Sequence, residues 1–228
     1  MCNLYTLDPA LTDLAAAFER FLGLELKLSA GPDTLSNQPW AKVVYPKYQG
    51  LFARPLDPGD PAQGLEPVVG RWGIVPFFHK GPAKAWKFPT NNCRSEDMAA
   101  KPSFRDCVKQ RRCIIPASAI CEWTGPQGSK TKHLITRADG APHFLAGLWA
   151  SHTWEGEETV SYTMVMQATA EGDDMHAFHN RQPVFLDREG AMTWLTCGAD
   201  YAGLLKGPPG GTLVADPPGA VGVGQLTG

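Results

Sequence analysis

The chain lacks the two kinds of segment that would direct it into or across a membrane. Its N-terminus has no basic region followed by an apolar run and a small-residue cleavage site, and no stretch approaches the roughly 20 apolar residues that span a bilayer. We therefore expect a cytoplasmic protein without a membrane partner.

The sequence also lacks the patterns that bind metals or cofactors. The cysteines include no Cys-x-x-Cys pair, and no combination of cysteine and histidine has the spacing of a zinc site. No glycine-rich loop suited to cradling a phosphate is present either. We expect no metal and no cofactor, and we expect every cysteine except Cys2 to be reduced and mostly buried. The other cysteines are Cys93, Cys107, Cys113, Cys121 and Cys197.

The sequence has no large excess of charge of either sign. A formal net charge of -2 argues against broad, charge-driven binding to nucleic acid or membranes. Any nucleic-acid site must therefore be a local patch. Hydrophobic residues make up 43% of the chain, which predicts a globular fold with a buried core and excludes extensive disorder.

Short apolar runs separated by turn residues are typical of a β-rich protein. Strands are expected at residues 41–45, 50–54, 68–75, 113–115, 119–123, 133–137, 143–149 and 161–168. Helices are expected at residues 8–23, 103–112, 187–195 and 200–205, each of which opens on an Asp or Ser that can cap it. The pattern predicts an α+β fold, a single β-rich domain in which a few helices edge a curved or barrel-like, mainly antiparallel sheet.

The composition changes at two places along the chain. Residues 54–67 are rich in Pro, Gly and Asp, which predicts an inserted loop. After Gly207 the sequence is rich in Gly and Pro and has almost no charge. We therefore predict a domain over residues 2–206 and an extended or flexible tail over residues 207–228.

Cys2 directly follows the initiator Met1. Removal of Met1 would leave a cysteine with a free α-amine beside its thiol, and this amine titrates near pH 8, well below the roughly 10.4 of a lysine. Such an amine can attack an aldehyde, and the neighbouring thiol can then close a five-membered thiazolidine ring in an intramolecular step. Many chains begin Met-Cys without such chemistry, so other residues must supply the rest of a site.

Polar residues interrupt the expected core pattern in separate segments. Asn92 and Arg94 lie in a polar stretch at residues 90–96, which can also be read as a solvated turn. Glu122 lies in an apolar run, either exposed at a strand end or held in a desolvated pocket where its pKa rises. His176 and His179 precede another apolar segment, and each is either a proton-transfer group or a surface histidine.

Several short motifs occur along the chain in a recognisable order. They are Met1-Cys2, RWGIVP at residues 71–76, NCRSE at 92–96, RCIIPA through EW at 112–123, AGLW at 146–149 and HNRQP at 179–183. Together these motifs resemble the SRAP family, the SOS-response-associated proteins that attach covalently to abasic sites in single-stranded DNA. The resemblance runs from Cys2 to about Leu195.

The resemblance implies a function and its catalytic residues. It implies a DNA-damage protein that senses abasic sites in single-stranded DNA and shields them in a covalent thiazolidine crosslink, with lyase-like or self-processing peptidase-like activity. Cys2, Asn92, Glu122 and His179 match the family's catalytic positions, which leaves His176 the less suitable histidine. We expect a monomer whose partner is single-stranded DNA containing abasic sites and which associates with the nucleoid when bound to it.

The expected DNA surface combines basic side chains with an aromatic platform. Trp72 and Arg94 match positions that the family uses around the DNA strand, and Trp72 or Phe77 is expected to stack on bases. The residues expected to contact phosphates are Arg94, Lys101, Arg105, Lys109, Arg111, Arg112 and Arg181. Basic residues on a helix are often only solvated, so Lys101 and Lys109 are open to either interpretation.

The chain departs from the family pattern at several positions. Asn3 and Leu4 replace a common Gly-Arg pair after Cys2, and further departures occur at Cys93, Cys121 and Gln182. We expect changes in packing and rate but the same class of reaction. Two other functions are compatible with the residues: an N-terminal-nucleophile cysteine hydrolase that uses its own amine as base, and a module that binds single-stranded DNA without a covalent step.

Overall fold

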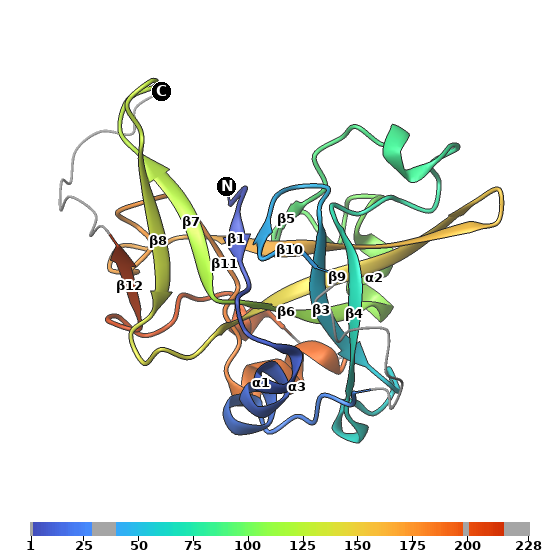
Figure 1. Cartoon of the computed structure of the whole chain (residues 1–228), viewed down its shortest axis with the longest axis horizontal. Coiled ribbons are helices and arrows are strands. Elements are labelled where there is room, and N and C mark those ends of the chain that lie inside the picture. The colour runs from blue at the N-terminus through green and yellow to red at the C-terminus, as the bar shows by residue number, and fades with distance from the viewer. Residues whose placement is uncertain (1, 29–39, 198–200, 217–228) are drawn as a thin grey trace.

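The computed structural model describes residues 2–28, 40–197 and 201–216. Strands β3 (Gln49–Pro55), β4 (Leu65–Trp72), β6 (Arg112–Ala117), β9 (His143–Trp154) and β10 (Glu157–Ala168) pair in a closed ring (Figure 1). The pairs are antiparallel apart from β4 with β10, which is parallel. Closure leaves these strands few free edges and confirms the predicted β-rich, barrel-like α+β fold.

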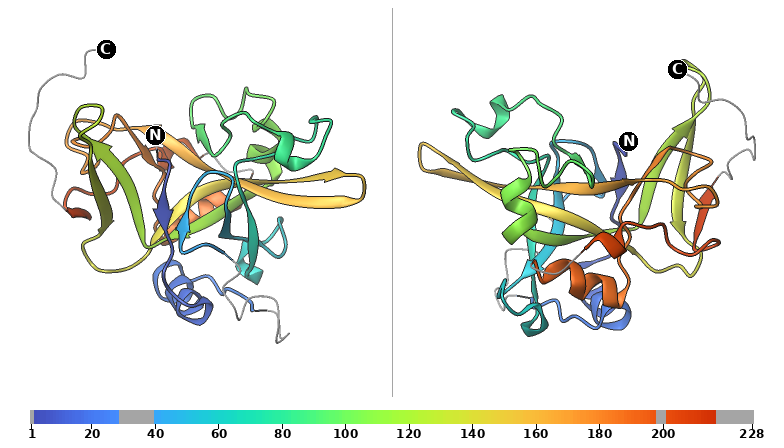
Figure 2. Two further views of the ribbon diagram at one scale, coloured as in Figure 1. Left: turned by 45° about the horizontal axis from the view of Figure 1, so that its top comes forward. Right: turned by 180° about the vertical axis from the view of Figure 1, so that it is seen from behind.

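Further short strands extend the ring at one end of β10. Strand β5 (Asn92–Arg94) pairs in parallel with β10, and β11 (Arg181–Pro183) pairs with it in antiparallel fashion. The C-terminal end of β9 and the N-terminal end of β10 form a hairpin that projects beyond the rest of the ring (Figure 2). Asn92 and Arg181 therefore lie on opposite sides of one strand although they are far apart in the sequence.

A second sheet holds the N-terminus. Its strands follow the order β12 (Leu213–Asp216), β8 (Thr131–Arg137), β7 (Ala119–Thr124), β1 (Tyr5–Thr6) and β2 (Val43–Val44). Strand β1 is paired on both sides, because Tyr5 lies opposite Ile120 of β7 and Val44 of β2. The start of the chain is thus fixed in the middle of the molecule, as Figure 1 shows.

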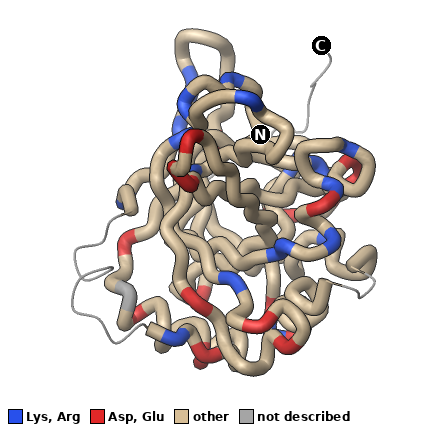
Figure 3. Tube along the Cα trace, turned by 90° about the vertical axis from the view of Figure 1, so that its right-hand side faces the viewer, with Lys and Arg blue, Asp and Glu red and all other residues tan. Residues whose placement is uncertain are grey.

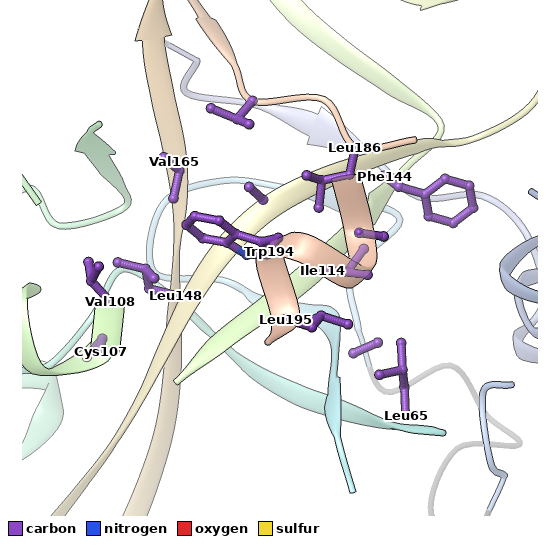
Figure 4. Packing of buried hydrophobic residues seen from close by; sticks show 14 of the residues in the cluster. Leu65, Cys107, Val108, Ile114, Phe144, Leu148, Val165, Leu186, Trp194 and Leu195 are labelled. Atoms are coloured by element: carbon purple, nitrogen blue, oxygen red, sulfur yellow. The ribbon is translucent and has the colours of Figure 1, made fainter. Parts of the chain in front are cut away.

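A large apolar cluster lies between the ring and the helices. Helix α3 (Arg188–Leu195) contributes Trp194, whose indole nitrogen donates to the carbonyl oxygens of Cys113 and Gly147 at 3.1 and 3.2 Å (Figure 4). Phe18 meets Phe144 edge to face, with ring centroids 4.9 Å apart. These contacts bury apolar area on one side of the ring.

A second apolar cluster surrounds the N-terminal strand. It contains Cys2, Tyr5, Trp72 and Tyr162, all fully buried. The hydroxyl groups of Tyr5 and Tyr162 are 2.5 Å apart and share a hydrogen bond. The cluster therefore fixes the first residues of the chain to the ring through packing and one buried polar contact.

The helices differ from their predicted bounds. The helix expected at 8–23 begins later, as α1 (Leu11–Ala17), and continues as a π-helix (Phe18–Leu22) that ends at Gly23 in the left-handed conformation. Asp8 does not cap it, because the N-cap is Ala10 and no side chain caps the helix. The helix expected at 103–112 is α2 (Arg105–Gln110), since Arg112 already belongs to β6.

The helices near the C-terminus are closer to expectation. The predicted cap of α3 is confirmed, because the carboxylate of Asp187 accepts from Gly190 N at 2.8 Å. The helix expected at 200–205 is reduced to a 3-10 turn (Ala202–Leu204), and residue 200 lies outside the described residues. No helix in the described ranges is both long and apolar enough to cross a bilayer.

The loop predicted at residues 54–67 is confirmed over residues 56–64, which form turns and a 3-10 segment, and is wrong at both ends. Its two ends belong to the paired strands β3 and β4, joined by a short 3-10 turn (Pro61–Gln63). Arg54 and Glu66 lie opposite each other and form an ion pair at 2.6 Å. Cross-strand pairing thus overrides the turn-like composition. Further short segments were not foreseen, among them the 3-10 turn at Ala83–Ala85 and strands β1, β5 and β11.

Part of the extended or flexible tail expected after Gly207 is a paired strand in the structure. Residues Leu213–Asp216 form β12, which pairs with β8, and Leu213 packs against Ile135 and Met175. The apolar Leu213 and the free edge of β8 explain the pairing, because a strand edge offers unpaired backbone groups. Residues 217–228 lie outside the described residues.

Gly50 lies against the apolar cluster that surrounds the N-terminal strand, and its substitution tests the packing there. A β-carbon at this position would collide with the hydroxyl groups of Tyr5 and Tyr162. We predict that Gly50→Ala destabilises the protein by about 1–3 kcal/mol, because the two tyrosines must separate to admit it. Urea unfolding measures the loss. Gly203→Ala is the control, since nothing lies within 4 Å of a β-carbon there; equal stability of both variants would contradict the prediction.

Candidate active site and nucleic-acid surface

Cys2 lies at the centre of the candidate site. Its side chain is 0% exposed, and its thiol donates to the carbonyl oxygen of Leu4 at 3.2 Å. Asn92, which is 90 positions away in the sequence, donates from Nδ2 to the carbonyl oxygen of Cys2 at 2.6 Å. Pairing of β5 with β10 carries Asn92 to this point. The structure therefore brings together two of the residues predicted to be catalytic.

Glu122 lies on β7, beside the first residues of the chain. Cys121 N donates to Leu4 O at 3.0 Å, which continues the pairing of β7 with β1 toward the N-terminus. The side chain of Glu122 is buried, and its Oε1 has no hydrogen-bond partner within the described part of the chain. Burial raises the pKa of Glu122 from 4.5 to about 7. Glu122 is thus the desolvated carboxyl group that the sequence offered as one of two possibilities.

The Cys2 thiol and Glu122 influence each other. Burial raises the pKa of the Cys2 thiol well above its usual range, and the nearby Glu122 carboxylate raises it further. The resting thiol is therefore protonated, and it can react only if a base removes its proton. A carboxyl group with a pKa near neutrality is well suited to exchange that proton.

His179 approaches the site from the loop before β11. Its ring is half-buried, and Nδ1 accepts a hydrogen bond from Arg181 N at 2.9 Å. Burial lowers the pKa of His179, and the charge of the amino terminus lowers it further. The neutral ring then has its proton on Nε2. His176, the alternative candidate, is exposed and contacts Thr169 at 3.2 Å.

The sequence did not single out His133 as a neighbour of the site. His133 lies directly opposite Glu122 across the pairing of β7 with β8, and it is buried. Its Nε2 is 2.7 Å from the hydroxyl of Thr124. Only the register of the hairpin reveals this neighbour, since residues opposite each other have Cβ atoms about 5 Å apart.

An exposed loop at residues 76–90 gathers aromatic and basic side chains. Phe77 is 60% and Phe88 67% exposed. Phe88 and Phe78 pack against the ring of the buried Trp86, and Phe77 packs against Phe78. The exposed lysines of the loop are Lys80, Lys84 and Lys87. No Asp or Glu occurs between residues 73 and 95. Apart from Phe77, these residues were missed, although the alternation of aromatic and basic residues around Trp86 signalled them.

In Figure 1 this loop and the N-terminus both lie toward the top of the molecule. In Figure 3, Lys and Arg positions are frequent in the upper part, where the N-terminus lies, whereas Asp and Glu predominate at the bottom. The near-zero net charge is therefore distributed unevenly. Such a local basic patch is the arrangement that the composition required of any nucleic-acid site.

Trp72 is not available as a stacking platform. Its side chain is fully buried, its Nε1 donates to Asn91 O at 2.7 Å, and its ring meets Tyr5 edge to face at 5.1 Å. The prediction that Trp72 stacks on bases is wrong, because both of its faces and its one donor are used inside the protein. Phe77 is exposed, and stacking there stays a prediction.

Arg112 is likewise unavailable for phosphate contact. It is 3% exposed, and its guanidinium donates to the carbonyl oxygens of Val108, Trp194 and Cys197 at 2.7, 3.1 and 2.9 Å. It also stacks over the ring of Trp194 at 4.8 Å. The prediction of a phosphate contact is wrong, since strand β6 turns this side chain into the core, where three carbonyl groups bind it.

The other predicted phosphate contacts stay predictions. The exposed ones are Arg94, Lys101, Arg105 and Lys109. Lys101 pairs with Asp97 at 3.0 Å, and Arg111 is half-buried. Arg181 forms an ion pair with Glu96 at 2.9 Å, which lowers the pKa of Glu96 to about 2. A phosphate at Arg181 would therefore have to compete with a carboxylate.

Metal ligands are not grouped anywhere in residues 2–28, 40–197 or 201–216. The cysteines other than Cys2 are unpaired there, and all but the half-buried Cys197 are buried.

The family model described as "SOS response associated peptidase (SRAP)" matches residues 1–215. The chain belongs to the SRAP family. The resemblance read from the motifs is thereby confirmed, and the match includes all of strand β12 except Asp216.

Several relatives of this SRAP chain are named abasic site processing proteins. It is 33% identical over 128 residues to abasic site processing protein YoqW of Bacillus subtilis, covering 55% of each chain. It is 30% identical over 131 residues to YedK of Escherichia coli, covering 58% of this chain and 54% of the relative. Over 150 residues it is 29% identical to HMCES of Gallus gallus, covering 55% and 44%. The matched region spans about half the length of these relatives.

Solved structures share the fold over nearly the whole chain. A protein of Bordetella bronchiseptica has a TM-score of 0.73 and 29% identity, covering 94% of this chain and 98% of the other. A protein of Bacteroides thetaiotaomicron has the same TM-score at 20% identity and covers 94% and 90%. The latter shows the fold alone.

The raised pKa of Glu122 predicts a pH-dependent cost to stability. A carboxyl group that binds its proton more tightly in the folded state than in the unfolded state lowers the free energy of unfolding as the pH rises from about 4.5 to about 7. We predict that Glu122→Gln gains stability relative to the native chain over this range, by up to about 3 kcal/mol at pH 8.

Urea unfolding between pH 5 and pH 8 measures this difference. Glu189→Gln, at an exposed position in the first turn of α3, is the control and should show no comparable gain. Parallel pH profiles for the native chain and Glu122→Gln would show that Glu122 is not desolvated.

Proposed function

We propose that this protein captures abasic sites in single-stranded DNA by forming a thiazolidine between Cys2 and the open-chain sugar. The observation that supports it best is the meeting of Cys2 with Asn92 and with a buried carboxyl group whose pKa is about 7. SRAP membership and relatives named for abasic-site processing support the choice of substrate. Removal of Met1 is required, because the reacting amine is otherwise part of a peptide bond.

The proposed reaction joins the aldehyde to both groups of Cys2. The α-amine attacks C1′ of the sugar, and loss of one water gives an imine. The thiol then adds to the imine carbon, a sulfur–carbon bond forms, and the thiol proton passes to the former imine nitrogen. The net change is one aldehyde plus one aminothiol giving a thiazolidine and water. The second step is fast because thiol and imine belong to the same residue.

Glu122 and His179 divide the proton transfers in this proposal. Glu122 takes protons from the amine and the thiol of Cys2, since its charge already acts on that thiol. The Nε2–H of His179 donates to the sugar oxygen that departs when the ring opens. Asn92 holds the Cys2 backbone through Nδ2, and its Oδ1, which has no partner among the described residues, is free to accept from the substrate.

The aromatic and basic loop supplies binding that does not depend on sequence. Phe77 and Phe88 offer exposed rings on which bases can stack, and the lysines between them can contact phosphates. Flexible single strands present such unstacked bases, whereas a duplex does not. We propose that the protein acts as a monomer on DNA in the cytoplasm, where the nucleoid supplies this partner.

Substitution of Cys2 tests the covalent step. We predict that Cys2→Ala forms no heat-stable adduct with an abasic oligonucleotide on a denaturing gel, whereas the native chain does. Cys2→Ser keeps the amine and loses the thiol, so it should form only an imine that borohydride must trap. Cys121→Ala is the control, because it removes a buried thiol that is not at the terminus.

The same assay separates the competing functions. Intact mass of the native adduct should equal the chain without Met1 plus the oligonucleotide minus one water. A stable adduct with Cys2→Ala would refute the mechanism. Amide or peptide products without an adduct would instead support an N-terminal-nucleophile hydrolase, and a salt-sensitive gel shift lost on denaturation would support non-covalent binding.

The stacking surface gives a separate prediction. Replacing both Phe77 and Phe88 by Ala should weaken binding to intact single-stranded DNA by about 5-fold or more for each base that loses its stack. Fluorescence anisotropy with a labelled oligonucleotide measures the dissociation constant. Leu56→Ala removes an exposed apolar side chain elsewhere and should have no effect; an equal loss in both variants would argue against stacking at this loop.

A further inference from the structure

The segment that carries His179 is an irregular connection between two strands. We call residues 169–180, between β10 and β11, the His179 loop. Thr169 Oγ1 donates to His179 O at 3.1 Å, and Thr169 N donates to Asn180 O at 3.1 Å. These contacts close the base of the loop, and side chains between residues 173 and 178 attach its outer part to neighbouring segments.

Asp174 attaches the outer part of the loop to the C-terminal strand. Its Oδ1 accepts from Gly211 N at 2.8 Å, and its Oδ2 accepts from Leu213 N at 2.8 Å. Both oxygens of one carboxylate are thus bound by backbone groups nearly 40 positions later in the chain. Hydrogen bonds to an ionised acceptor are roughly twice as strong as those between neutral groups.

Met175, the residue after Asp174, connects this attachment to His179 by a backbone hydrogen bond. Met175 is fully buried and packs against Ile135 of β8 and Leu213 of β12. Its carbonyl oxygen accepts from His179 N at 3.1 Å and from Phe178 N at 3.0 Å. A single helical turn therefore connects the anchored Met175 to His179, and the position of one sets the position of the other.

The same sheet positions Glu122. Strand β12 pairs with β8 from Leu213 opposite Arg137 to Asp216 opposite Leu134, and β8 pairs with β7, where Glu122 lies opposite His133. The connection from Glu122 to His179 thus runs through paired backbone and then through Asp174. The two groups proposed to transfer protons are fixed relative to each other by this path.

We propose that Asp174 is a positioning residue, which holds His179 at the active site by binding the backbone of Gly211 and Leu213. The C-terminal segment at residues 207–216 is consequently part of the active-site framework. This inference rests on the proposed role of His179 in crosslinking. Asp174 itself does not touch the substrate.

Crosslinking rates of the full-length chain test this inference. Asp174→Ala should slow adduct formation at saturating abasic oligonucleotide by about 10- to 100-fold, because small misplacements of a catalytic group have effects of this size. The dissociation constant for intact single-stranded DNA should not change. Asp216→Ala is the matched control, since this exposed aspartate lies on the same strand and should leave the rate unchanged.

A double variant distinguishes positioning from a general loss of structure. If Asp174 acts through His179, Asp174→Ala combined with His179→Ala should be no slower than His179→Ala alone. Effects that multiply in the double variant, or an unchanged rate for Asp174→Ala, would overturn the inference. Should Asp174→Ala fail to fold, Asp174→Asn keeps one acceptor and should give a rate between those of the native chain and His179→Ala; a native rate would overturn the inference.

Hydrogen exchange provides a readout that does not need the reaction. Asp174→Ala should speed amide exchange of residues 178–181 while β7 keeps its protection. Unchanged exchange in residues 178–181 would overturn the inference. A native chain that forms no adduct overturns the proposed function, and exchange then decides by itself whether Asp174 holds the loop.

Discussion

The pairing of the short strand β1 between β7 and β2 is the constraint on which the site depends. A chain terminus ordinarily frays, because few contacts hold it. Here Tyr5 is hydrogen-bonded within a sheet on both sides and packed against Trp72 and Tyr162, so Cys2 is fixed in the interior rather than at an edge. The proposed nucleophile, the α-amine of Cys2 after removal of Met1, needs this anchoring, since orientation supplies much of the rate of an intramolecular ring closure.

Burial gives the site its chemistry and also weakens the fold. The unpartnered Oε1 of Glu122 and the raised pKa of its carboxyl group both follow from removing that group from water. A paired carboxylate at the surface would destabilise the folded state less, but it would be fully ionised at neutral pH. The same desolvation keeps the Cys2 thiol protonated, which protects it at rest and makes it dependent on a neighbouring base.

The basic residues are divided between structural and surface roles that their sequence positions do not distinguish. Arg112 binds carbonyl groups in the core, and Arg181 is paired with Glu96, whereas the lysines around Trp86 face solvent. Strand alternation and the end of α2 decide this, because they turn Arg112 inward one residue after Arg111. The aromatic and basic loop can therefore offer a local nucleic-acid surface on a chain with almost no net charge.

The sequence by itself determined the family, the β-rich fold class and the chemical groups of the candidate site. Ordered motifs and alternating apolar runs are local properties that survive without knowledge of the fold. It could not determine the pairing of β3 with β4 across an apparent loop, the strand formed after Gly207, or the burial of Trp72 and Arg112, since each depends on partners far away in the chain. Only the tertiary structure decided that Asn92 and Glu122 lie beside Cys2 and that Asp174 binds the backbone of Gly211 and Leu213, because strand register and long-range hydrogen bonds, not composition, set those distances.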